Sequence, residues 1–266
     1  MTQDGDQWCC DPHVAEFYDQ WETEVDDVEL IRSLIGGRGP LRILEPFAGT
    51  GRIFVPLALD GHVIVGMERS RHMLDRARAR ISALPEDARS RSKLIEADVT
   101  KCRWPSGFDI VLLGGNCFYE LPSPEEQEYC VASAASALVP GGYVYVDNDH
   151  MEGDLAESWR RPGVRRTMFP NGTCADGARL EGTTELVWFD AGRRLSRNRR
   201  TIKMTSPDGR VQSWEWVQQK HPPSKDEVEA MLLKHGFVVE KTFGDRAGSA
   251  YEPSSPRAIF WARTNA

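Results

Sequence analysis

Short apolar runs alternate with helical segments between residues 41 and 149, and this alternation constrains the fold more than any other feature of the chain. The apolar runs are 41–45, 62–68, 92–99, 108–116 and 143–149. The fourth run, FDIVLLGGN, is so apolar that both of its faces must be covered. Strands that alternate with helices indicate a parallel sheet with right-handed crossovers. We therefore predict a doubly wound α/β fold.

The pattern changes after the fifth run. Residues 180–220 are expected to form an antiparallel meander, with turns at Ala191-Gly192 and at 206–209, SPDG. A helix is predicted at 224–237, and two strands follow it. The predicted parts are an N-terminal segment (1–25), a core (26–150), an antiparallel cap (151–221), and a C-terminal helix and strands that complete the core sheet (222–266).

The turn after the first apolar run, LEPFAGTGRI at 44–53, limits the choice of ligand. A dinucleotide site needs GxGxxG, but Phe54 stands where the third glycine would be. A P-loop needs Gly-Lys-Ser/Thr, whereas Arg52 follows the second glycine here. What remains is an acid before the turn, in the pattern Glu45-x-x-x-Gly49-x-Gly51. This carboxylate suits a ligand that has an ammonium group and no phosphates.

Two further acids end the next two apolar runs. Glu68 ends the second run and can accept hydrogen bonds from both hydroxyls of a ribose. Asp98 ends the third run and can accept one from the amino group of an adenine. The carboxyl ends of parallel strands lie at one edge of a sheet, which is where such sheets bind ligands. Three acids at this edge favour S-adenosylmethionine.

These motifs resemble those of class I S-adenosylmethionine-dependent methyltransferases. LEPFAGTG resembles their motif I, VGMERS the acidic motif II, EADVT the adenine-contacting motif, and ALVPGGYVYVD the strand after the next helix. Motif I departs from the usual Asp-x-Gly-x-Gly-x-Gly, since Pro46 and Phe47 occupy its centre and Ala48 replaces the first glycine. The Gly49–Gly51 turn and the acid are intact.

The resemblance implies a Rossmann-like, seven-stranded sheet with an inserted antiparallel cap. It also implies S-adenosylmethionine as cofactor and S-adenosylhomocysteine as product, with residues 1–25 folded over the cofactor. The implied cofactor contacts are Tyr18, Trp21, Glu45, Ala48, Gly49, Thr50, Gly51, Glu68, Arg69, Met73, Asp98, Val99 and Gly114.

The acceptor side is similar to glycine N-methyltransferases and to natural-product N-methyltransferases. GGNCFYEL at 114–121 resembles LGNSFAHL of the glycine enzyme, which places Asn116 near the acceptor. Asp149 aligns with the arginine that clamps the acceptor's carboxylate there, although Arg160, Arg165 or Arg166 could restore a clamp. Because an acid repels a carboxylate, we expect a neutral or cationic amine as acceptor. The candidate catalytic residues are Asn116, Tyr119, Asp149, His150 and His221.

The function remains open between several classes. N-methylation of a small molecule leads, and O-methylation of a small natural product is an alternative. Methylation of nucleic-acid bases is a further alternative, but those enzymes carry [DNS]PP[YF] where this chain has GGNC, and the net charge of −7 argues against a nucleic-acid partner. A non-catalytic S-adenosylmethionine-binding protein is less favoured.

The remaining expectations concern location, metals and partners. The six cysteines form no CxxC pair and have no zinc spacing, so we expect reduced thiols, a cytoplasmic protein and no metal. No apolar run approaches the roughly 20 residues that span a bilayer, so no membrane association is expected. Trp188, Trp214 and Trp216 either pack within the cap or form the face of a homodimer.

Overall fold

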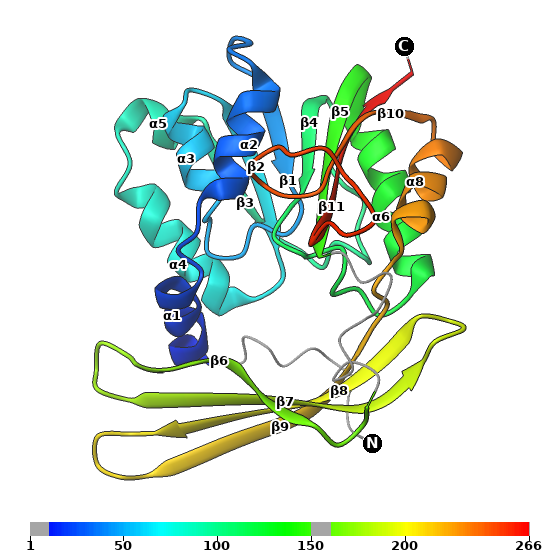
Figure 1. Cartoon of the computed structure of the whole chain (residues 1–266). Helices are drawn as coiled ribbons and strands as arrows, with labels where there is room; N and C mark the ends of the chain where they lie inside the picture. The colour runs from blue at the N-terminus through cyan, green and yellow to red at the C-terminus, as the bar shows by residue number, and fades with distance from the viewer. Residues whose placement is uncertain (1–10, 150–160, 266) are drawn as a thin grey trace.

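The computed structural model describes residues 11–149 and 161–265. They form a large sheet with helices on both faces and a separate small sheet beneath its lower edge (Figure 1). The large sheet has the strand order β10-β11-β5-β4-β1-β2-β3. Its strands are β1 (Arg42–Glu45), β2 (Val63–Glu68), β3 (Ser92–Glu96), β4 (Phe108–Leu113), β5 (Leu138–Asp149), β10 (Phe237–Phe243) and β11 (Arg257–Thr264).

Strands β1 to β5 pair in parallel, and β11 pairs antiparallel with both β5 and β10. The predicted doubly wound, seven-stranded sheet is therefore confirmed. The chain winds outward in one direction from β1 to β3 and in the other from β4 onward, so the strand order reverses between β1 and β4. A crevice forms at the carboxyl ends of the strands at such a reversal, which is where open α/β sheets bind ligands.

The helices bury the two faces of this sheet in separate apolar clusters. One cluster contains side chains of α2 (Asp26–Ile35), α3 (Phe54–Leu59) and α4 (Arg71–Ser82). The other contains side chains of α6 (Pro124–Ala137) and α8 (Lys225–Lys234). A short helix, α5 (Glu86–Ser90), leads into β3. Strand β4, which both clusters cover, is the run that the sequence marks as buried on both faces.

The small sheet is an antiparallel meander of β6 (Arg165–Thr173), β7 (Arg179–Asp190), β8 (Leu195–Thr205) and β9 (Val211–Lys220). Its last three strands and the two turns between them confirm the predicted meander. Strand β6 was not predicted, because its segment contains Pro170 and Gly172, which weaken strand propensity. Its position at the edge of the sheet explains why a proline is tolerated there.

Helix α1 (Pro12–Trp21) joins the two sheets and was likewise not predicted as a helix. It begins at the N-cap Asp11, whose side chain accepts a hydrogen bond from the backbone of His13. Its buried Phe17 contacts Phe169 of β6, with ring centroids 4.9 Å apart. In Figure 1 it lies between α4 and the small sheet. No helix in the described part of the chain is long and apolar enough to cross a membrane.

Candidate active site

A cavity of about 1440 Å³ lies between the carboxyl ends of the parallel strands and the small sheet. A ligand site for one drug-sized molecule has about 300–1,000 Å³, so this cavity has room for a cofactor and a second molecule. Twelve of the thirteen expected cofactor contacts line it, and Gly51 lies in the turn beside it. The twelve are Tyr18, Trp21, Glu45, Ala48, Gly49, Thr50, Glu68, Arg69, Met73, Asp98, Val99 and Gly114.

The turn after β1 has the backbone that its glycines predict. Gly49 and Gly51 have φ angles of +53° and +84°, which residues with a side chain rarely adopt. The turn packs closely on β2, because a Cβ atom at Gly66 would lie 2.8 Å from that of Ala48. The glycines thus allow the backbone to curl tightly at the edge of the cavity.

Glu45 ends β1 beneath this turn and is buried. Its Oε2 has no hydrogen-bond partner among the described residues. Burial raises the pKa of its carboxyl group well above the usual value, and the charge of Arg52 opposes this rise. An ammonium group of a ligand would supply the donor that Oε2 lacks, because a buried acceptor without a partner is unfavourable.

Glu68 ends β2 and is held by two backbone donors. Its Oε2 accepts from the N–H of Gly49 at 3.1 Å, and its Oε1 accepts from that of Ser70 at 2.7 Å. Burial raises its pKa above the usual value, and these hydrogen bonds oppose part of that rise. Each carboxylate oxygen keeps a lone pair, so the group can still accept from two hydroxyls of a ribose.

Asp98 follows β3 and accepts hydrogen bonds from the hydroxyl of Thr100 and the ammonium group of Lys101, each at 2.8 Å. Burial alone would raise its pKa, but these contacts bring the pKa below its usual value. Asp98 is therefore an ionised acceptor at the cavity wall. The orphaned oxygen of Glu45 and the oriented carboxylate of Glu68 together fit S-adenosylmethionine.

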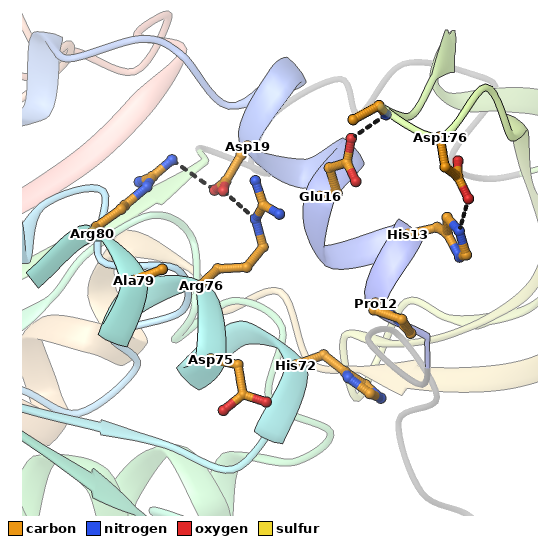
Figure 2. Close-up of a pocket in the computed structure, with 11 residues that line it drawn as sticks. Pro12, His13, Glu16, Asp19, His72, Asp75, Arg76, Ala79, Arg80 and Asp176 are labelled. Atoms are coloured by element: carbon orange, nitrogen blue, oxygen red, sulfur yellow. Dashed lines mark hydrogen bonds and ion pairs between the residues drawn. The ribbon is translucent and has the colours of Figure 1, made fainter. Parts of the chain in front are cut away.

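Tyr18 and Trp21 of helix α1 and its C-cap residue Glu22 line one side of the cavity. Contacts on two sides hold the helix in place, as Figure 2 shows. Towards the small sheet, the Nε2 of His13 lies 2.9 Å from Asp176. Towards the core, Asp19 contacts Arg76 at 2.5 Å and Arg80 at 2.8 Å.

Asn116 lines the cavity, but its side chain is directed towards Asp149 and Arg257. Its Nδ2 donates to Asp149 at 3.0 Å, and its Oδ1 accepts from Arg257 at 2.7 Å. Arg257 also donates to the carboxylate of Asp149 at 2.7 Å. Asp149 is not among the described residues that line the cavity. Arg257 pairs with Asp149 and also with the buried Asp147, so it offsets the charge of Asp149 only in part. The expected neutral or cationic acceptor stays a prediction.

Two other candidate residues lie behind the cavity wall. Tyr119 is buried, and its ring lies beneath the ammonium group of Lys220 at 4.9 Å. The buried ring of His221 contacts the Oε1 of Gln127 at 2.7 Å, and burial lowers its pKa. Neither is among the described residues that line the cavity, so their positions do not support a role as general base. His150 and Arg160 lie outside the described residues.

The small sheet, which the resemblance implied as a cap, contributes one wall of the cavity. Its polar side chains at the cavity are Arg166, Thr167, Thr184, Arg197, Asn198, Arg200, Gln218, Gln219 and Lys220. Glu120, from the loop after β4, accepts from Gln218 at 2.9 Å and pairs with Arg200 and Lys220. Polar residues at alternate positions of β8 and β9 indicate that these side chains share one face of the sheet. The sequence pattern does not indicate which part of the protein that face packs against.

Comparisons with known proteins agree with this geometry. Residues 43–142 match a family model described as a methyltransferase domain. The glycine/sarcosine N-methyltransferase of Halorhodospira halochloris is 26% identical in an alignment of 155 residues that covers 54% of this chain. The match spans about half of that protein, 55% of its length.

Two solved structures share the fold over nearly the whole chain. The CcbJ methyltransferase from Streptomyces caelestis has a TM-score of 0.73 and 20% identity, and the match covers 98% of this chain and 100% of that one. The sugar N-methyltransferase KedS8 from Streptoalloteichus sp ATCC 53650 has a TM-score of 0.74 and 16% identity, with coverages of 100% and 97%. The matched domain, the sheet order and the glycine turn together support the resemblance of this chain to class I S-adenosylmethionine-dependent methyltransferases.

Proposed function

We propose that this protein transfers a methyl group from S-adenosylmethionine to the nitrogen of a small-molecule amine. The observation that carries the proposal is a single cavity that both parts of the protein line. In it, Glu45, Glu68 and Asp98 lie on one side and the small sheet on the other, and the space between them has room for more than one ligand. In support, the relatives named above include an N-methyltransferase for glycine and sarcosine and one for a sugar.

The proposal assigns one task to each wall. Glu45 would bind the cofactor's ammonium group, Glu68 the ribose hydroxyls and Asp98 the adenine amino group. Residues of α1 would cover the cofactor, and the small sheet would act as the acceptor cap. When bound, S-adenosylmethionine supplies a methyl group on a positively charged sulfur, which the lone pair of an amine can attack.

The contribution of the chain to the reaction is mainly positioning. Holding two reactants in line can be worth about 7–11 kcal/mol in favourable cases. Asn116 lines the cavity, and Asp149 and Arg257 hold its side chain by hydrogen bonds. We propose that these contacts fix the position of the loop after β4, and that the acceptor binds against this loop. A neutral amine already has a free lone pair, and its proton can leave to solvent after transfer.

The proposal is tested by titrating the purified chain with S-adenosylhomocysteine in a calorimeter and by incubating it with S-adenosylmethionine and a panel of small acceptors. We expect binding of the cofactor product and methylated amines by mass spectrometry. Methylated phenols alone would point to O-methylation, and methylated RNA or DNA would point to a base methyltransferase. Binding without turnover across the panel would support a non-catalytic protein and contradict the proposal.

A further inference from the structure

Gln218 of β9 lies in the cavity wall that the small sheet forms, and it is more than nine-tenths buried, with 8% of its surface exposed. Asn198 of β8 is its register partner, lines the same cavity and is 6% exposed. Directly opposed residues of antiparallel strands point to the same side of the sheet. Two neutral amide groups therefore lie next to each other in this wall.

The orientation of the Gln218 amide follows from its contact with Glu120. The Nε2 of Gln218 donates to the carboxylate of Glu120 at 2.9 Å. Burial alone would raise the pKa of Glu120, but Lys220 and Arg200 bring the pKa below its usual value, so the group is ionised. An ionised carboxylate accepts hydrogen bonds and donates none. The amide must therefore present its N–H to Glu120, and its oxygen cannot be the atom that Glu120 engages.

This oxygen, the Oε1 of Gln218, has no hydrogen-bond partner among the described residues. The adjacent Gln219 differs, since its Nε2 donates to the carbonyl of Pro122 at 2.9 Å and its Oε1 accepts from Arg197 at 3.1 Å. A buried acceptor without a donor is unfavourable. A molecule bound in the cavity that Gln218 lines can supply the missing donor.

The chemistry of the amide favours a neutral donor. An ammonium group buried against an uncharged oxygen would lack the opposite charge that a buried ion needs. Glu120 does not supply this charge, because Gln218, Arg200 and Lys220 already bind its carboxylate. A hydroxyl group has one O–H donor and needs no opposite charge.

We propose that the Oε1 of Gln218 accepts a hydrogen bond from a hydroxyl group of the acceptor, so that the substrate is an amine that also has a hydroxyl group. This inference rests on the proposed function and adds a specificity-determining residue to the same cavity. A site built to bind a hydroxyl group rejects an analogue without one, because the polar group of the site then stays unpaired.

The test uses the full chain saturated with S-adenosylhomocysteine. Two probes, glucosamine and cyclohexylamine, are titrated separately while the protein NMR signals are followed. Both are ring amines, but only glucosamine has hydroxyl groups. The variants are Gln218→Leu and Gln218→Met, which remove the amide. The matched control is Gln212→Leu, because Gln212 is an exposed residue of the same strand and is not among the described residues that line the cavity.

We expect the wild type to bind glucosamine more tightly than cyclohexylamine. Both Gln218 variants should bind glucosamine about tenfold more weakly than the wild type does, since its hydroxyl group loses a buried partner. Their affinity for cyclohexylamine should stay unchanged, and Gln212→Leu should behave as the wild type. With S-adenosylmethionine as cofactor, turnover should show the same preference for glucosamine in the wild type and its loss in the Gln218 variants.

The inference is overturned if the wild type does not prefer glucosamine, which includes binding of neither probe, or if both Gln218 variants keep the preference. Thermal unfolding and affinity for S-adenosylhomocysteine, measured for each variant, separate a local loss of the acceptor atom from misfolding. If the wild type does not bind S-adenosylhomocysteine, or binds it but methylates no amine, the proposed function itself fails. If it methylates both amines equally well, the inference alone fails.

Discussion

Arg257 of β11 donates a hydrogen bond of 2.7 Å to Asn116, a residue 141 positions earlier in the loop after β4. The same guanidinium pairs with Asp147, which is fully buried in β5. Arg246 links Asp147 to Asp27 of α2, and Asp27 in turn holds Arg52 beside the glycine turn. One hydrogen bond and a chain of ion pairs thus connect the loop after β4 with the glycine turn after β1.

Arg257→Met should unfold at lower denaturant concentration than the wild type. The change leaves the buried Asp147 with one cation fewer, and breaking a buried ion pair costs about 3–5 kcal/mol. Arg263→Gln is the matched control, because this exposed arginine of the same strand donates to the backbone of Gly141. Equal free energies of unfolding for the two variants would contradict the role of the network.

Glu68→Gln should bind S-adenosylmethionine about tenfold or more weakly, because two hydroxyl donors lose a charged acceptor. Calorimetric titration measures the change. Glu96→Gln serves as control, since Glu96 is the register partner of Glu68 on β3 and is exposed. A similar loss in both variants would show that charge at the sheet edge, and not ribose contact, sets the affinity.

Phe17→Ala should destabilise the protein by about 3–5 kcal/mol, the usual range for removing a buried phenylalanine ring. Phe17 fills the space above Gly172, where a Cβ atom would lie 1.7 Å from its ring. Because α1 also lines the cavity, cofactor affinity should fall as well. Val211→Ala, at an exposed position of β9, should change neither quantity. Unchanged cofactor affinity in Phe17→Ala would mean that α1 does not cover the cofactor.

The contact between α1 and the small sheet should weaken as pH rises. Burial alone would lower the pKa of His13, but Asp176 and Asp11 raise it above its usual value of 6.5. A raised pKa in the folded state stabilises the protein fully below the unfolded value, and this stabilisation is lost as pH rises through the folded value.

We therefore expect the difference in unfolding temperature between the wild type and His13→Gln to be largest below about pH 6.5 and to shrink above it. Asp176→Asn should reduce the same difference, because it removes one of the two carboxylates that face the ring. A difference that is constant over this range of pH would show that His13 contributes through packing alone.

Much of the core could be predicted because its evidence is local. The strand ends at Glu45 and Glu68 and the glycines between them follow from spacing within one short stretch, and parallel strands necessarily bring these ends to one edge. Strand β6 could not be predicted in the same way. Pro170 and Gly172 read locally as turn residues, and only the position of β6 at the edge of the sheet makes them acceptable.

The acceptor side depended on contacts between distant segments. Asp149 looks like a free acid in the sequence, but Arg257, 108 positions away, donates a hydrogen bond to its carboxylate. His221 looks like a candidate base, but Gln127 of α6 holds it behind the wall. By itself, the sequence determined the parallel sheet and the acidic edge that suits the methyl donor. Only the tertiary structure decided which charged side chains face the cavity, because this depends on which face of the small sheet packs towards the core.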